Sequence, residues 1–146
     1  MTNETMRKFG YPDSLVREFD HWAVLLRPGQ VTLGSLVLAA NSDATAFGAL
    51  PAGAHAELAK ITAEIEATLK AEVQYERINY LMLMMVDPHV HFHIFPRYEG
   101  SRSCKEVVID DLGWPGPPDL KSAVQMPAAT FTWLRNLLMQ NWLTNY

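Results

Sequence analysis

The sequence predicts an α+β fold: a mostly antiparallel β-sheet with one long helix packed on it and a second helix near the C-terminus. Two apolar segments joined by a turn indicate a β-hairpin, and a later segment carries apolar side chains at helical spacing. A third observation is a run of alternating histidine and apolar residues, which suits an extended strand with two different faces.

The hairpin is predicted at residues 19–26 and 31–39, which are rich in apolar and β-forming types. Residues 27–30, with the sequence Arg-Pro-Gly-Gln, contain residue types that favour turns. A tight turn joins antiparallel neighbours, so we expect these two strands to pair directly.

A helix is predicted over residues 54–73. Apolar side chains recur there at steps of three and four residues, at Ala54, Leu58, Ile61, Ile65 and Leu69. Glu66 and Lys70 are four residues apart and form a favourable pair on the polar side. A helix with one apolar side is expected to cover one face of a sheet.

Two further strands are predicted at residues 78–86 and 89–95, joined by a short Asp-Pro step. Methionines crowd the first of these strands at Met82, Met84 and Met85. Their flexible side chains are expected to fill gaps in the core.

The segment after residue 100 has a different composition. Residues 100–103 are predicted to form a loop, and residues 110–119 are too rich in Pro and Gly for a regular helix or a central strand. Trp114 is expected to anchor this second loop. Pro127 suits the first turn of a C-terminal helix. Apolar residues of that helix, expected in the core or a dimer contact, are Phe131, Leu134, Leu138 and Trp142.

Length and composition fit a single domain over residues 1–146, with a core at about 15–100 and a tail at 101–146. The net charge of −4 argues against a general nucleic-acid binder or a protein of anionic membranes. The N-terminus lacks the apolar centre of a signal peptide, and no apolar stretch has the length of a membrane span. A single cysteine cannot form an internal disulfide, so a cytoplasmic location is expected.

Three histidines, His89, His91 and His93, alternate with apolar residues. In a strand the imidazoles would line one face, with His91 roughly 6.5 Å from each neighbour along the chain, so a phosphate could contact more than one ring. A zinc site is the main alternative, although Cys104 is the only cysteine. A purely structural role for the three histidines is the second alternative.

The run at residues 87–98, Asp-Pro-His-Val-His-Phe-His-Ile-Phe-Pro-Arg-Tyr, resembles the signature of the histidine triad (HIT) superfamily of nucleotide hydrolases and transferases. Segments 19–28, 32–38 and 78–82 resemble the strands that precede this signature. The resemblance covers about residues 15–100 and is to bacterial diadenosine polyphosphate hydrolase-like proteins. It implies a HIT-like fold.

The resemblance also implies an enzyme in which His91 attacks the α-phosphorus of a nucleotide and forms a nucleotidyl-histidine intermediate. His89 and His93 would orient that ring and, when protonated, stabilise charge on the phosphate. The substrate would be a dinucleoside polyphosphate or a nucleoside phosphoramidate. No metal or other cofactor is implied, and a homodimer is expected.

Three alternatives stay open. A nucleotidyltransferase would use the same histidine with phosphate as the acceptor. A non-catalytic nucleotide-binding or sensor protein would keep the binding site without turnover. A metalloenzyme would use the histidines of the strand as ligands.

Candidate substrate contacts come from several predicted strands: Arg27, Ser35, Asn79, Arg97, Phe19 and Leu25. Arg97 could bind phosphate oxygens bidentately, or else form an ion pair with Glu99 or a dimer contact. Phe19 and Leu25 are expected on one strand face, opposite Trp22, which is expected in the core.

The sequence departs from the family pattern at two positions. Ser35 follows the glycine that opens the second strand, where many relatives have histidine. Met85 stands where many have an asparagine that contacts phosphate. A serine hydroxyl is a weaker contact and a methionine offers none, although Asn79 could supply an amide elsewhere.

Overall fold

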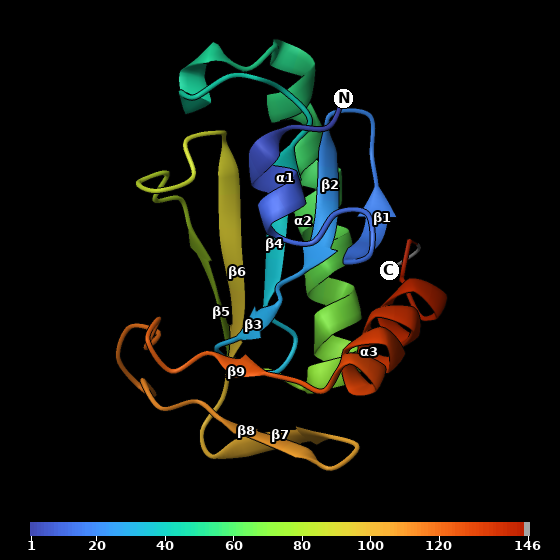
Figure 1. Ribbon diagram of the computed structural model, residues 1–146, viewed down its shortest axis with the longest axis vertical. Helices are drawn as coiled ribbons and strands as arrows, with labels where there is room; N and C mark the ends of the chain where they lie inside the picture. Colours follow the sequence, from blue (N-terminus) through green and yellow to red (C-terminus); the bar gives the residue numbers. More distant parts are fainter. Residues whose placement is uncertain (145–146) are drawn as a thin grey trace.

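The computed structural model describes residues 1–144 (Figure 1). Its helices are α1 (Glu4–Lys8), α2 (Ala52–Val73) and α3 (Ala128–Gln140), with a short 3₁₀ turn at Phe47–Ala49. Its strands are β1 (Leu15–Glu18), β2 (Trp22–Leu26), β3 (Gly29–Gln30), β4 (Leu36–Ala40), β5 (Arg77–Leu81), β6 (His91–Arg97), β7 (Ser101–Cys104), β8 (Val107–Asp110) and β9 (Val124–Gln125). Within the described chain, no helix combines the length and apolarity needed to cross a membrane.

Five strands form one antiparallel sheet in the order β1-β2-β4-β6-β5. The predicted hairpin is present as the pair β2 and β4. Its connection is longer than the predicted tight turn, because β3 pairs with β9 from the C-terminal part of the chain. The α+β fold class predicted from the sequence is confirmed.

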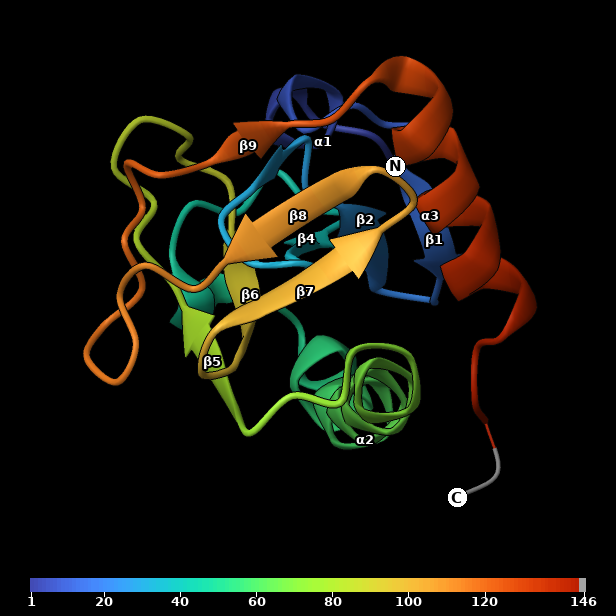
Figure 2. The same ribbon diagram turned by 90° about the horizontal axis from the view of Figure 1, so that it is seen from below.

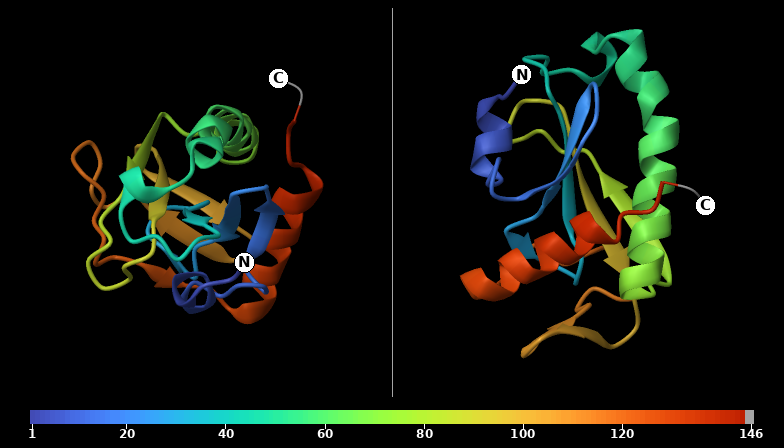
Figure 3. Two further views of the ribbon diagram at one scale, coloured as in Figure 1. Left: turned by 90° about the horizontal axis from the view of Figure 1, so that it is seen from above. Right: turned by 90° about the vertical axis from the view of Figure 1, so that its right-hand side faces the viewer.

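The two faces of the sheet are covered by different helices (Figure 3). The predicted long helix is α2, and Ile61, Ile65 and Leu69 of its apolar side are buried against one face. The indole of Trp22 is fully buried on this face and donates a hydrogen bond to the Ala54 carbonyl at 2.8 Å, so Trp22 belongs to the core as expected. The short helix α1 covers part of the opposite face.

The two strands predicted around the histidines have different boundaries. β5 ends at Leu81, and β6 begins only at His91. Residues 82–90 between them form a connection that is not paired in the sheet. Met85 is 86% exposed in this connection, which makes the expectation of a core position wrong for that residue. β6 continues through Pro96, which lies beyond the last pair between β6 and β4 at Ile94, so its missing N–H breaks no bond to β4.

The predicted loop at 100–103 is wrong, since β7 and β8 form a hairpin beneath the end of the sheet (Figure 2). Lys105 turns this hairpin with a φ of 54°. The side chain of Arg102 holds the hairpin to the end of α2 through a 2.8 Å hydrogen bond to the Val73 carbonyl.

The loop predicted at 110–119 lies between β8 and β9. The C-terminal helix ends before Trp142, whose indole instead donates to Glu64 at 2.7 Å.

Candidate active site

Two histidines of the run project from β6 on the face opposite α2. His91 and His93 pair with β4 residues that pack under α1, whereas Phe92 and Ile94 point toward the core beneath α2. His89 precedes the strand, so its ring is not placed by strand alternation. The expectation that one strand face would carry all three rings is therefore correct for two of them.

The tautomer of His91 is fixed by the backbone carbonyl of His89. Its Nδ1 lies 2.7 Å from the His89 carbonyl oxygen, which can only accept a hydrogen bond. Nδ1 therefore carries the proton in the neutral ring, and the lone pair is on Nε2. His91 is only 1% exposed, but Nε2 has no partner among residues 1–144, and no buried partnerless side-chain nitrogen occurs in that range, so Nε2 keeps contact with solvent.

The His93 ring, whose centroid lies 5.0 Å from that of His91, is neutral. Burial, then the charge of Arg27 and then that of His91 together lower the pKa of His93 to about 4, against a smaller opposing effect of Asp87. Arg27 Nε donates to His93 Nδ1 at 3.3 Å, so the proton of the neutral ring is on Nε2. The expected protonated imidazole at this position is thus replaced by a neutral N–H donor, and Arg27 supplies the positive charge.

The N-terminal segment covers the histidines. The Phe9 ring lies 5.7 Å from the ring centroid of His91 and 5.5 Å from that of His93. Thr5 Oγ1 lies 2.8 Å from His89 Nδ1 and so holds the ring that the strand does not place. The N-terminal segment therefore contacts all three histidine rings.

Sequence reasoning missed this segment, although a local signal exists. The Asn3 side chain caps α1 by accepting from the Met6 amide at 2.9 Å, which is a common way to begin a helix. Met6 and Phe9 are spaced three residues apart and turn toward the sheet. Lys8 also forms an ion pair with Asp87, which lies on the loop that leads to the histidines. The Lys8 Nζ and Asp87 Oδ1 atoms are 2.7 Å apart.

Three of the residues predicted to contact substrate make contacts inside the protein instead. Ser35 is fully buried, and its hydroxyl donates to the Thr32 carbonyl at 2.7 Å inside the turn before β4. Leu25 is fully buried beneath α1. Phe19 packs on the α2 side, 6.4 Å from the Trp142 ring, because the chain turns between β1 and β2 and strand alternation does not extend back to it.

Asn79 and Arg97 lie on the same sheet face as the histidines but farther along it. Arg97 is 3% exposed and forms a bidentate pair with Asp111, at 2.7 and 2.9 Å. Its remaining nitrogen Nη1 donates to Asn79 Oδ1 at 2.7 Å. The alternative ion pair of Arg97 with Glu99 is therefore wrong, because the guanidinium is already held by Asp111, which the sequence did not single out.

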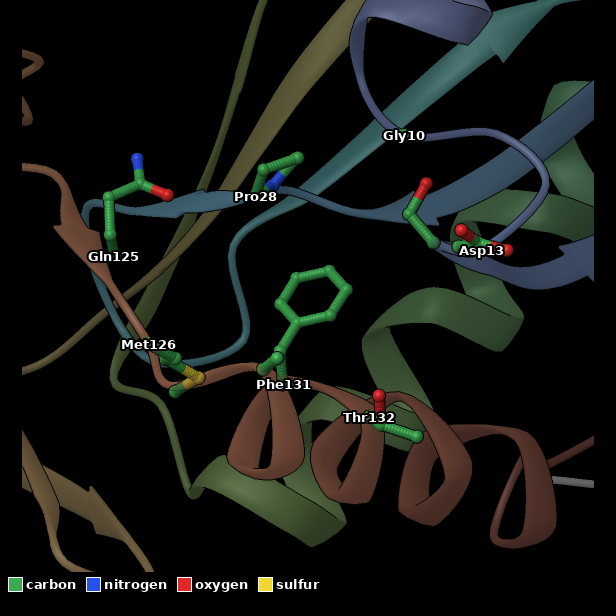
Figure 4. A pocket seen from close by; sticks show the side chains of 9 residues that line it. Gly10, Asp13, Pro28, Gln125, Met126, Phe131 and Thr132 are labelled. Carbon is green, nitrogen blue, oxygen red and sulfur yellow. The ribbon is translucent and has the colours of Figure 1, made fainter.

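A cavity of about 380 Å³ opens beside the histidine face (Figure 4). The Phe131 ring of α3 projects into it toward Pro28. Pro28 and Gly10, which line it, are each one residue from a side chain that contacts His93, namely Arg27 and Phe9. Its other lining residues are Asp13, Ser14, Gln125, Met126, Ala128 and Thr132.

Comparison with solved structures identifies the fold. A histidine triad protein from Sinorhizobium meliloti is 22% identical, with a TM-score of 0.74 over 97% of this chain and 96% of its own. One from Bradyrhizobium japonicum is 16% identical, with a TM-score of 0.74 over 98% of each chain. A hypothetical histidine triad nucleotide-binding protein from Sulfolobus tokodaii is 20% identical, with a TM-score of 0.66 over 88% and 82%.

The chain has the histidine triad fold. No protein-family model and no curated protein matches the sequence. Within this histidine triad fold, the chain presents an imidazole with a free Nε2, a neutral N–H donor on His93 and the charge of Arg27. Among residues 1–144, no three His, Cys, Asp or Glu side chains are grouped as a metal ion would require.

Proposed function

We propose that the chain is a nucleotide hydrolase of the histidine triad type, which cleaves at the α-phosphate of a dinucleoside polyphosphate or a nucleoside phosphoramidate. The observation that carries this proposal is the hydrogen bond from His91 Nδ1 to the His89 carbonyl. It directs the lone pair of Nε2 away from the backbone and makes the ring more nucleophilic. The similar protein from Sulfolobus tokodaii is named as a nucleotide-binding protein, which supports the class of ligand.

In the first step, the Nε2 lone pair of His91 forms a bond to the α-phosphorus, and the bond from phosphorus to the leaving oxygen or nitrogen breaks. The leaving group takes the electron pair and a proton from water. In the second step, a water oxygen attacks the same phosphorus, the bond to Nε2 breaks, and a nucleoside monophosphate is released. The neutral imidazole is regenerated, and protons from the attacking water go to solvent.

Arg27 and His93 would stabilise the charge on the phosphate oxygens. Arg27 uses Nε on His93 and Nη1 on the Gly29 carbonyl, which leaves Nη2 without a partner in the described chain. His93 contributes its Nε2–H as a neutral donor, because the low pKa of about 4 keeps the ring uncharged near pH 7. Arg27 thus takes the electrostatic role that sequence reasoning gave to protonated histidines.

The test is AMP release from diadenosine tetraphosphate and from adenosine phosphoramidate in excess chelator. His91→Ala should lower turnover of both substrates by at least about 10³-fold, since it removes the proposed nucleophile. His55→Ala removes a histidine of α2 and should leave turnover unchanged. Wild-type turnover retained in His91→Ala would overturn the assignment, and activity that needs added Zn²⁺ would favour the metalloenzyme.

Two variants of this function use the same residues. If inorganic phosphate speeds release of the nucleotide as a diphosphate, the protein is a nucleotidyltransferase. A non-catalytic nucleotide sensor is favoured by one observation, the 1% exposure of His91 beneath Phe9. Nucleotide binding without release of AMP under all these conditions would select the sensor.

The same proposal takes residues 1–146 as one domain that acts in the cytoplasm as a homodimer. β5 is one of the two edge strands of the sheet, and its outer edge pairs with no strand among residues 1–144, which supports association through that side. Sedimentation at micromolar concentration measures the mass directly. A species of monomer mass would remove the dimer from the proposal and leave the chemistry of His91 untouched.

A further inference from the structure

The side chain of Gln30 is fully buried in the connection between β2 and β4. Its Nε2 donates to the Arg27 carbonyl at 2.7 Å and to the Ser35 carbonyl at 2.9 Å. Its Oε1 accepts from the Gly34 amide at 2.8 Å and from the Ser35 amide at 3.2 Å. A primary amide has two N–H donors and two acceptor lone pairs, so the hydrogen-bonding capacity of Gln30 is used completely.

These bonds join the two ends of the connection. The Arg27 amide donates to the Ser35 carbonyl at 2.9 Å, and the same carbonyl accepts from Gln30. Both backbone polar groups of Arg27 are therefore bonded within the connection, one to Ser35 and the other to Gln30. Because the Gln30 side chain is 0% exposed, its effect on the candidate active site passes through the residues that it holds.

The side chain of Arg27 extends from this connection to the histidines. Its Nη1 donates to the Gly29 carbonyl at 2.6 Å, and its Nε donates to His93 Nδ1 at 3.3 Å. A Cβ on Gly29 would lie 3.1 Å from Arg27 Nη1, so the guanidinium packs directly on the backbone of the connection. The bond to His93 is at the long end of hydrogen-bond distances, so a small displacement of the Arg27 backbone would break it.

We propose that Gln30 is a positioning residue of the candidate active site, which holds the backbone of Arg27 so that the guanidinium stays against His93 with Nη2 available to a phosphate oxygen. The catalytic part of this role rests on the proposed function, because it needs Arg27 to stabilise charge on a phosphate. The geometric part, the effect of Gln30 on Arg27 and His93, does not. An amide suits the position, since it offers two donors and two acceptors without a buried charge.

The first test measures the pKa of the His93 ring by NMR titration of the whole protein and is independent of turnover. Gln30→Met keeps the approximate volume and removes all four hydrogen bonds. It should raise this pKa from about 4, by no more than Arg27→Met does, because the charge of Arg27 is one of the causes that lower it. In an Arg27→Met background, Gln30→Met should have no further effect. His91 and Asp87, the other charged groups that act on His93, are retained in every variant.

The matched control is Tyr98→Phe. The Tyr98 hydroxyl accepts from the Leu33 amide at 2.8 Å, so its removal also loosens the connection but leaves the hydrogen bonds of Arg27 in place. This variant should not change the pKa of His93. The inference is overturned by an unchanged His93 pKa in Gln30→Met, by an equal rise in Tyr98→Phe, or by the same rise with and without Arg27.

Gln30→Glu replaces Gln30→Met if the latter does not fold. It keeps the two acceptors for the Gly34 and Ser35 amides and loses the bond to the Arg27 carbonyl. Its carboxylate also acts on His93 directly, so the rise in pKa is compared with the rise that the same substitution causes in an Arg27→Met background. A smaller rise in that background supports the inference, and an equal rise overturns it.

The second test is steady-state kinetics with diadenosine tetraphosphate. Gln30→Met should lower kcat and kcat/KM together by about tenfold, as expected when a contact made only in the transition state is weakened. Tyr98→Phe should leave both constants unchanged. A rise in KM alone would overturn the catalytic role. A His93 pKa that depends on Gln30 through Arg27, in a protein that releases no AMP, would retain the positioning role and reject the proposed hydrolase.

Discussion

The His93 ring shows how one buried side chain sets the charge of the candidate site. It is 8% exposed, and its Nδ1 accepts from Arg27, so protonation would place a second positive charge beside the guanidinium in a poorly solvated position. Burial is the larger cause of its low pKa and Arg27 the next. The site therefore keeps one permanent cation, Arg27, and a neutral His93.

This shift predicts a pH dependence of stability. The pKa of His93 falls from 6.5 to about 4 on folding, so between these values the unfolded chain binds more protons than the folded one. The His93 contribution to the free energy of unfolding is thus fully present above pH 6.5 and is lost as the pH falls toward 4. Urea denaturation at pH 7.5 and pH 4.5 measures it. His93→Gln should reduce the difference between the two pH values, whereas His21→Gln should retain it.

A related prediction concerns Arg27. Arg27→Met removes the second-largest cause of the shift and should raise the pKa of His93, without restoring it to 6.5, because burial remains. Titration of the ring by NMR follows this pKa directly. The matched variant Arg17→Met, on β1, should not change it. A His93 pKa that is insensitive to Arg27→Met would show that the guanidinium does not act on the ring.

At the scale of elements, α1 is a short cover on the histidine face. A helix of this length has little stability of its own, so it stays in place through Met6, the cap of Asn3 and the contacts of Phe9 and Thr5. The same contacts leave His91 1% exposed. We therefore expect the position of this segment to affect how readily a nucleotide reaches His91.

Removal of the Phe9 ring should expose His91. We expect Phe9→Ala to raise the rate at which diethylpyrocarbonate modifies His91 severalfold, as mapped by mass spectrometry of the modified peptide. Phe47→Ala removes a ring that packs on His55 and should not alter that rate. If Phe9→Ala and wild type react at the same rate, Phe9 does not control access.

The loop after β8 depends on one buried ion pair. Its two side chains, Arg97 and Asp111, are 4% and 1% exposed. Asp111→Asn leaves the guanidinium buried without its counter-charge and should lower the free energy of unfolding by about 3–5 kcal/mol. Chemical denaturation measures this loss. Asp110→Asn changes the exposed neighbour and should cost less than about 1 kcal/mol. A small effect of Asp111→Asn would show that solvent reaches Arg97.

The whole molecule is a sheet with unlike covers on its two faces. The α2 face holds the larger buried cluster and the α1 face the smaller one, beside the histidines. Global stability is thus expected to come mainly from the α2 side. This arrangement allows the cover over His91 to move without unfolding of the core.

A core substitution tests this division. Ile65→Ala in α2 should lower the free energy of unfolding by about 2–5 kcal/mol, since it leaves a cavity against the sheet. Lys60→Ala, at an exposed position of the same helix, should cost about 1 kcal/mol or less. Urea titrations of both variants decide the point. Equal effects of the two substitutions would contradict the position of Ile65 at the centre of the core.

The sequence by itself determined the features that depend on local periodicity. The spacing of Ile61, Ile65 and Leu69 predicted α2, and alternation after residue 90 placed His91 and His93 together on one strand face. The resemblance of residues 87–98 predicted the histidine triad fold that the solved structures share. Each of these signals comes from residues a few positions apart, where chain geometry fixes which side chains share a face.

Only the tertiary structure decided which groups surround the histidines. Arg27 meets His93 across 66 positions and Thr5 meets His89 across 84, and no periodicity reports such contacts. The end of β5 at Leu81 and the capture of Arg97 by Asp111 likewise depend on which segments become neighbours. The charge and accessibility of the candidate site follow from these long-range contacts, because burial and nearby charges exist only once the chain has folded.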